Sequence, residues 1–207
     1  MLNAKKMKNW IIIIFAFLAF SSWGQNHNPK ELGIGFAIAT NPYQFENLTH
    51  PTKIFTDQEL KTKRTDGDIF PFFYKPDYGL YHFICLKKTK DFYKILINDS
   101  EIAFIPNDSN FYFQTWDVIL LNSSVARKFK TEPIRKEHST KSDSILYDCE
   151  FDRLSVTDII EIKGEYWLSV EFSPKCEDYP TKVTKINYGW IKWRTDKGLL
   201  IRIMLLC

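Results

Sequence analysis

Histidines, cysteines and serines are the residues of this chain that could carry nucleophilic or acid–base chemistry. The histidines are His27, His50, His82 and His138, and a papain-like pair would need Cys85 beside His82 or His138. His82 and Cys85 lie in a strand-like run with no activating helix start, so we expect His82 to be structural. No G-x-S-x-G, Walker, GxGxxG, HExxH or EF-hand spacing occurs. We therefore predict a non-catalytic protein with no cofactor and no metal, although carboxylates that only the fold brings together would leave no motif.

The first 24 residues are typical of a secretory signal peptide. Three lysines (Lys5, Lys6 and Lys8) precede an 11-residue apolar run, Trp10–Phe20, and small residues stand at −3 and −1 of a cut before Gln25. An uncleaved membrane anchor is the alternative, but it needs roughly 18 or more apolar residues. No cysteine follows the run closely enough for a lipoprotein. We expect an exported bacterial protein, periplasmic or extracellular, without a stable membrane anchor after cleavage.

Export would bring the four cysteines into an oxidising compartment. Spacings of 64, 27 and 31 residues separate Cys85, Cys149, Cys176 and Cys207, with no C-x-x-C pair, so a zinc ribbon or a thioredoxin-like site is not expected. Because three of the four lie in the second half, we predict one bridge there and a buried free thiol at Cys85. Cys149–Cys176 is preferred over Cys176–Cys207, and four unpaired cysteines are the alternative.

Net charge argues against nucleic acid as a partner. The chain has 28 basic and 25 acidic residues, and the signal contains three lysines and no acid, so the mature chain carries 25 of each. Neither half has the one-signed field that nucleic acid or an anionic membrane attracts.

Short runs of apolar, aromatic and β-branched residues between polar turns predict a mainly β fold. Helical signals are scarce, and only Thr115 before residues 116–121 indicates a capped short helix, with a strand over the apolar residues 118–121 as the alternative. The expected strands cover 80–86, 92–97 and 102–105 in the first half, and 154–163, 166–172, 188–194 and 199–206 in the second.

The two halves resemble copies of one β unit. Matching points are 80 residues apart for Ile54 and Ile134, 75 for Phe92 and Trp167, and 86 for Phe104 and Trp190. These offsets predict a joint near 122–130. The expected organisation is a signal peptide (1–24), a lead-in (25–44) and two domains (45–125 and 126–207).

The second half also resembles bacterial SH3 (SH3b) domains, through Gly164-Glu165-Tyr166-Trp167-Leu168-Ser169-Val170 and Gly189-Trp190-Ile191. The first half is a degenerate version, with Phe92 for the Trp and Ala103 for the Gly. The resemblance implies two small, partly open five-stranded barrels in tandem. Domains of this family commonly bind cell-wall peptides or other ligands, often beside an enzyme domain, for which this chain has no room.

Strand alternation sends aromatic side chains away from the expected cores. Ile191 is predicted to point inward with Trp167 also in the core, while Gly189 lets a neighbouring strand approach closely. Trp190, Tyr188 and, in the first half, Phe104 are then left outside as a candidate ligand edge. Alternatively, these aromatics pack the domains together or lie under a loop.

Two functions fit this sequence. The first is a secreted, non-catalytic module that binds an extended peptide or a cell-wall fragment through the outward aromatics. The second is a periplasmic inhibitor or immunity-type protein that binds an envelope protein through the loop 173–187. An open aromatic groove would favour the first, and a protruding, disulfide-braced loop would favour the second.

Overall fold

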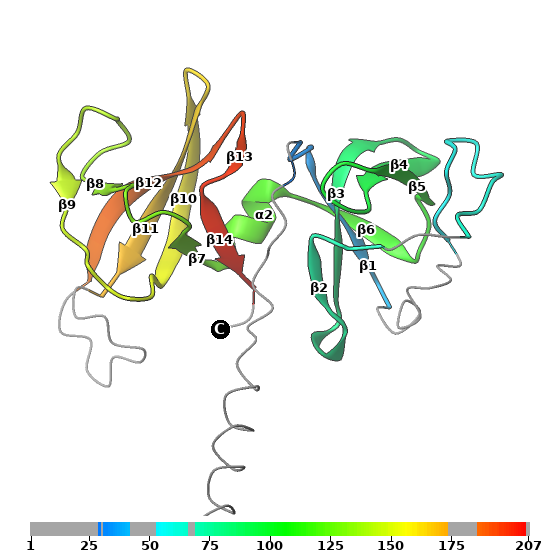
Figure 1. Cartoon of the computed structure of the whole chain (residues 1–207), viewed down its shortest axis with the longest axis horizontal. Helices are drawn as coiled ribbons and strands as arrows, with labels where there is room; N and C mark the ends of the chain where they lie inside the picture. The colour runs from blue at the N-terminus through cyan, green and yellow to red at the C-terminus, as the bar shows by residue number, and fades with distance from the viewer. Residues whose placement is uncertain (1–28, 30, 42–52, 66–68, 174–185, 206–207) are drawn as a thin grey trace, which may run out of the picture.

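The computed structural model describes residue 29 and residues 31–41, 53–65, 69–173 and 186–205. In these ranges the chain is mainly β, with two antiparallel sheets side by side and a short helix between them (Figure 1). The predicted mainly β fold with little helix is therefore confirmed. The predicted signal peptide lies outside the described residues.

The part of the chain that the structure describes contains no helix both long enough and apolar enough to span a membrane. Its one α-helix, α2 (Trp116–Leu121), has six residues and follows Thr115, as the sequence predicts. Thr115 occupies the N-cap position without a side-chain capping hydrogen bond. Tertiary packing of Trp116, Ile119 and Leu120, all buried, therefore accounts for the helix better than its cap does.

Sheet A has the strand order β5-β4-β3-β1-β6, with β2 added beside β3. A 3-10 turn, η2 (Pro76–Tyr78), joins β2 to β3. The first strand of sheet A lies within the segment 25–44, which was expected to be a lead-in, so the sheet begins before residue 45. The strands are β1 (Gly35–Ala39), β2 (Phe73–Lys75), β3 (Leu80–Lys88), β4 (Phe92–Leu96), β5 (Ile102–Pro106) and β6 (Phe111–Thr115).

Sheet B has the order β14-β7-β10-β11-β12-β8-β9, with β13 beside β12, and curls into a partly open half-barrel (Figure 1). Its first strand crosses the expected boundary at 125/126. The strands are β7 (Ser124–Arg127), β8 (Ile134–Arg135), β9 (Ser144–Ile145), β10 (Leu154–Ile162), β11 (Glu165–Phe172), β12 (Asn187–Thr195), β13 (Gly198–Leu199) and β14 (Ile201–Met204).

The two sheets repeat one strand order, because β6-β1-β3-β4-β5 in sheet A matches β14-β7-β10-β11-β12 in sheet B. A short segment pairs with the far side of the last strand in each, through Phe55 and Phe104 in one and Arg135 and Trp190 in the other. Phe55 and Arg135 are 80 residues apart, and Phe104 and Trp190 are 86 residues apart. These are the offsets between the two halves that the sequence predicts.

The pairing registers and irregularities also match. Phe92 pairs with Pro106, and Trp167 pairs with Lys192, which reproduces the offsets of 75 and 86. Each third strand is irregular at the same point, between Cys85 and Lys87 in β3 and between Val156 and Asp158 in β10. A β-bulge bends and twists a strand locally, so both sheets bend at corresponding places.

The core of the molecule consists of two apolar clusters. One fills the inside of sheet A, with residues such as Phe83, Ile95 and Ile105. The other fills the inside of sheet B and continues through α2 onto the second face of sheet A. Trp116 makes this connection, with ring centroids 4.5 Å from Phe36 in β1 and 5.4 Å from Trp193 in β12.

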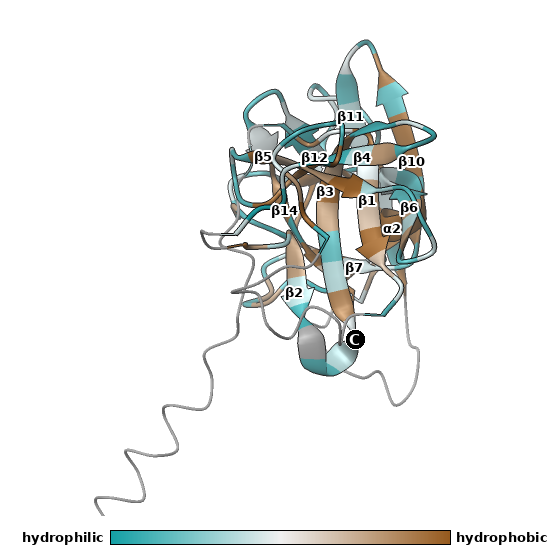
Figure 2. Ribbon diagram, turned by 90° about the vertical axis from the view of Figure 1, so that its right-hand side faces the viewer, coloured by the Kyte–Doolittle hydropathy of each residue, from teal (hydrophilic) through white to brown (hydrophobic). Residues whose placement is uncertain are grey.

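Hydropathy follows this arrangement, since apolar residues lie mainly along the strands and α2 and polar residues in the connections (Figure 2). The Trp116 indole Nε1 donates a 2.8 Å hydrogen bond to the Leu32 carbonyl oxygen, so its polar atom is satisfied inside the junction. The two sheets are therefore joined by a continuous core, and the hydrogen bond fixes α2 to the segment that precedes β1.

Two glycines shape the part of sheet B that carries the candidate site. Lys163 and Gly164 both have positive φ angles (52° and 76°), which is typical of the tight turn joining β10 to β11. A Cβ on Gly189 would lie 2.5 Å from a methyl carbon of Ile134 and 3.0 Å from the Arg135 carbonyl oxygen. The predicted close approach of a neighbouring strand at Gly189 is thus confirmed, and the neighbour is β8.

Candidate functional site

Tyr188 and Trp190 lie on the outer face of sheet B, as strand alternation predicts. Ile191 on the same strand belongs to the sheet B core, whereas Tyr188 is 62% exposed and Trp190 is half-buried. In β11, Glu171 stands opposite Tyr188 and Ser169 opposite Trp190. Because directly paired residues share a face, these groups surround the aromatic pair with hydrogen-bonding side chains.

One side of Trp190 is covered by His138, from the connection between β8 and β9. The two rings meet edge to face with centroids 5.2 Å apart. This connection is held in place because Arg135 Nη1 donates to the Ser142 carbonyl oxygen (2.8 Å) and the Glu137 amide donates to Ser142 Oγ (3.0 Å). Trp190 is therefore partly covered by a loop, which was the alternative expectation for these aromatics. Tyr188 remains exposed to solvent.

Trp167 lies on this same outer face and is nevertheless only 1% exposed. Its burial confirms one prediction, but it belongs to neither apolar cluster, because its partner across the strands is Lys192 rather than a core residue. The Lys192 ammonium lies 5.2 Å from the centre of the Trp167 ring and 2.6 Å from Glu165 Oε1. The hydrogen bond from Lys192 lowers the pKa of Glu165, so this ion pair stays charged above the ring.

Phe104 is not part of this arrangement. It lies in β5 of sheet A, at the opposite end of the molecule from β8 and β9 (Figure 1). Its ring packs against Phe92 edge to face at 5.5 Å, and its backbone exchanges two hydrogen bonds with Phe55. The structure thus brings Tyr188 and Trp190 together and leaves Phe104 as a separate, half-buried aromatic at the equivalent position of the other sheet.

The histidine and cysteine of the third strand do not form a catalytic pair. His82 contacts the Phe36 and Phe73 rings on one face of sheet A, and Cys85 lies in the cluster on the other face. Burial lowers the pKa of His82 to about 4 and raises the pKa of Cys85 to about 12. His82 is therefore neutral and the Cys85 thiol protonated at neutral pH.

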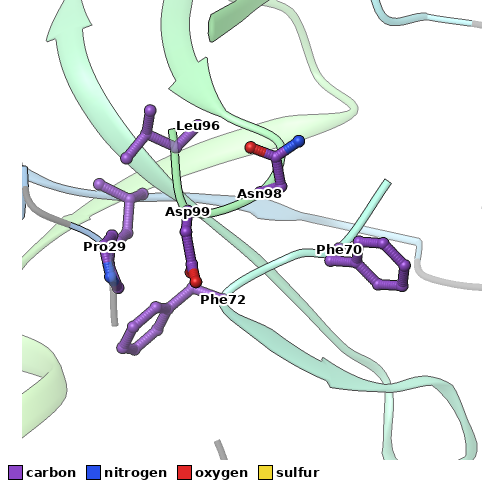
Figure 3. Close-up of a pocket in the computed structure, with 7 residues that line it drawn as sticks. Pro29, Phe70, Phe72, Leu96, Asn98 and Asp99 are labelled. Atoms are coloured by element: carbon purple, nitrogen blue, oxygen red, sulfur yellow. The ribbon is translucent and has the colours of Figure 1, made fainter. Parts of the chain in front are cut away.

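A search of the described residues finds no group of three or more His, Cys, Asp or Glu side chains placed to hold a metal ion. The described part of the chain does contain a small hollow on sheet A, which is lined by Phe70, Phe72, Leu96, Asn98 and other residues (Figure 3). Its free volume of about 10 Å³ has room for about one water molecule. No sequence motif marks this hollow, and its size does not suit an organic ligand.

The cysteine predictions are met in part. Cys85 is a buried free thiol, as predicted. Cys149 is buried and disulfide-bonded. Cys176 and Cys207 lie outside the described residues, so the pairing Cys149–Cys176 remains a prediction. Most of the loop 173–187, residues 174–185, also lies outside them.

Comparison of the chain with known protein families, with curated proteins and with solved structures finds no match. The resemblance to SH3b domains therefore remains a prediction from the quoted motifs. What bears on function is the geometry of the described residues. An aromatic pair lies on the outer face of sheet B, with Tyr188 exposed and Trp190 half-buried, and polar side chains flank it. The described histidines and cysteines do not assemble into a catalytic pair.

Proposed function

We propose that this protein is an exported, non-catalytic binding module that recognises an extended peptide or a cell-wall fragment on the outer face of sheet B. Tyr188 and Trp190 provide the stacking surface. The observation that carries the proposal is the 62% exposure of Tyr188 beside Trp190 on a sheet whose inner face already has a complete core. Packing inside the fold therefore does not account for Tyr188.

The groups around the aromatic pair favour a neutral ligand with many hydrogen-bonding atoms. Two residues of opposite charge flank the pair, Glu171 on β11 and Arg135 on β8. On β11, Ser169 lies between Glu171 and Trp167 on the same face. Thr157 Oγ1 donates to Ser169 Oγ (2.8 Å), which extends the polar surface onto β10. Peptide backbones and sugar hydroxyls match such donors and acceptors, while the aromatic rings supply the apolar contact.

The central experiment is a binding titration of the mature protein with soluble peptidoglycan fragments. We expect Tyr188→Ala and Trp190→Ala to weaken binding about 5- to 30-fold each, since loss of one stacked ring removes about 1–2 kcal/mol. Binding should change little between low and physiological salt, because few uncompensated charges take part.

Tyr112→Ala is the matched control, because Tyr112 is 44% exposed in β6 of sheet A. Phe104→Ala is the second control, at the sheet A position equivalent to Trp190. Equal loss of binding in Tyr112→Ala and Tyr188→Ala, or retention of full binding in both Tyr188→Ala and Trp190→Ala, would overturn the proposal.

A further inference from the structure

The segment 146–153, which we name the strap, connects β9 to β10 along the lower edge of sheet B (the yellow-green trace between them in Figure 1). Its side chains alternate between the protein and solvent. Tyr147, Cys149 and Asp152 are buried, whereas Leu146 is 92% exposed and Phe151 is 79% exposed. These are the two most exposed large apolar side chains among the described residues.

The buried side of the strap is held by an ion cluster. Asp152 accepts hydrogen bonds from Arg127 Nε (2.6 Å) and from Lys130 Nζ (2.5 Å). Burial alone would raise the pKa of Asp152, but these hydrogen bonds outweigh burial and hold the pKa below its ordinary value. Arg127 and Lys130 also donate to the Tyr147 and Cys149 carbonyl oxygens, at 3.1 Å and 2.5 Å.

Ring packing and a covalent bond add to this anchoring. The Tyr147 ring packs on Phe172 at 4.7 Å between centroids, and the Arg127 guanidinium lies 5.7 Å from the Tyr147 ring centre. Cys149 is disulfide-bonded. The strap is therefore fixed by its inward residues, and Leu146 and Phe151 are presented to solvent from an ordered backbone. Presentation in a fixed conformation reduces the ordering cost of binding.

We propose that the strap is a docking element for a protein partner whose surface offers two apolar pockets with basic side chains between them. Leu146 and Phe151 would fill the pockets. Asp148 and Glu150, exposed between them and without an ion pair among the described residues, would face the basic side chains. Exposed apolar side chains at both ends of a braced segment indicate a contact surface rather than a fold requirement.

The length and the charge of the strap limit the kind of partner that can bind to it. Five residues of extended chain span at most about 17 Å, so Leu146 and Phe151 fit within one protein interface. The two carboxylates between them disfavour an anionic lipid surface, which attracts basic segments. The strap thus fits the inhibitor class of function through a segment other than the loop 173–187, and it shares no residue with the Tyr188 and Trp190 surface.

Site-specific photo-crosslinking in the producing cell tests this proposal. A photoreactive phenylalanine analogue replaces Leu146 or Phe151, and the matched control carries it at Ile162, which is 37% exposed at the end of β10, next to the β10–β11 turn. We expect one and the same protein to be captured from positions 146 and 151 and not from position 162. The captured protein is then identified by mass spectrometry and purified for binding measurements.

Purified variants decide whether the strap chemistry drives the interaction. Leu146→Ser and Phe151→Ser should each weaken binding of the captured protein at least tenfold. The double change Asp148→Lys and Glu150→Lys should do the same and should reverse the salt dependence, because it replaces attraction to the basic side chains by repulsion. Glu161→Lys with Ile162→Ser is the control, because it alters a neighbouring acidic and apolar pair on the hairpin turn and should leave binding unchanged.

Several results would overturn the proposal: no protein adduct at either strap position, an adduct that is a second copy of this chain, or equal capture at position 162. Binding of the wild-type protein to anionic lipid vesicles that is lost in Leu146→Ser would also overturn it, in favour of a membrane. Trp190→Ala separates this proposal from peptidoglycan binding, because it should leave strap crosslinking intact.

Discussion

Sheets A and B share a strand order, a pairing register and the position of a bulge, yet they use matching positions differently. Where sheet A has buried Ala39, opposite Phe111, sheet B has buried Arg127, opposite Ile201. The second face of sheet A is covered by α2 and the adjoining core, whereas the outer face of sheet B carries Tyr188 in solvent. A common backbone plan thus supports a packed scaffold in one half and an open surface in the other.

Matching aromatic positions show the same divergence. Phe92 and Phe104 of sheet A pack on each other, which satisfies both rings within the fold. Their counterparts Trp167 and Trp190 in sheet B are instead covered by Lys192 and by His138. Because polar side chains cover these two tryptophan rings, sheet B has apolar surface and hydrogen-bonding groups next to each other. This divergence supports the proposal that sheet B, and not sheet A, carries the ligand surface.

The largest effect is expected from the ion cluster that sheet A lacks. Asp152→Ala should lower the free energy of unfolding by about 3–5 kcal/mol, because it leaves the buried Arg127 guanidinium without its carboxylate. Urea unfolding of the purified variant measures this loss. The double variant Arg127→Ala with Asp152→Ala should recover part of it. A stable single variant would show that the cluster does not anchor the strap.

Replacement of equivalent aromatics gives a smaller, graded effect. Trp167→Ala should cost about 3 kcal/mol, since it removes a nearly inaccessible ring, and Phe92→Ala about 1–2 kcal/mol, since Phe92 is half-buried. Thermal and urea unfolding of the two variants provide the comparison. Wild-type stability of Trp167→Ala would contradict the packing of sheet B described above.

An effect of similar size to that of Phe92→Ala is a pH dependence that comes from His82 in sheet A. The pKa of His82 is about 4 in the folded protein and 6.5 ordinarily, so between these values the unfolded chain binds a proton that the folded protein does not. Stability should therefore fall as pH falls through this window, by about 2 kcal/mol between pH 7 and pH 5. His82→Phe should remove that part of the slope in urea unfolding at each pH, and an unchanged slope would contradict the assignment.

Turn residues and alternation were sufficient to predict the longer strands, because strands such as β11 and β12 have one buried and one solvent-facing side. The shorter strands β2, β6, β7 and β9 were not predicted. The strand β1 escaped prediction because Gly35–Ala39 is buried throughout and shows no alternation. The offsets between the halves were also readable, since the same residue types recur at Ile54 and Ile134. Local patterns were informative wherever the two faces of a strand meet different surroundings.

Long-range features of the candidate site could not be read in this way. Sequence places Phe104 and Trp190 at equivalent positions, but their separation follows from how the two sheets pack around α2. The burial of Trp167 under Lys192 depends on a pairing between two strands. The strap was missed because its anchors, Arg127 and Lys130, lie about 20 residues from the carbonyl and carboxylate groups that they bind.

The core that runs through Trp116 has a consequence for folding. Each half repeats the other's topology, yet the second face of sheet A and the open end of sheet B share one apolar cluster through α2. Separating the halves would expose Phe36 and Trp193 to water at the same time. The two halves therefore depend on each other for burial of this cluster, and heating should melt both sheets in one cooperative transition instead of two successive ones.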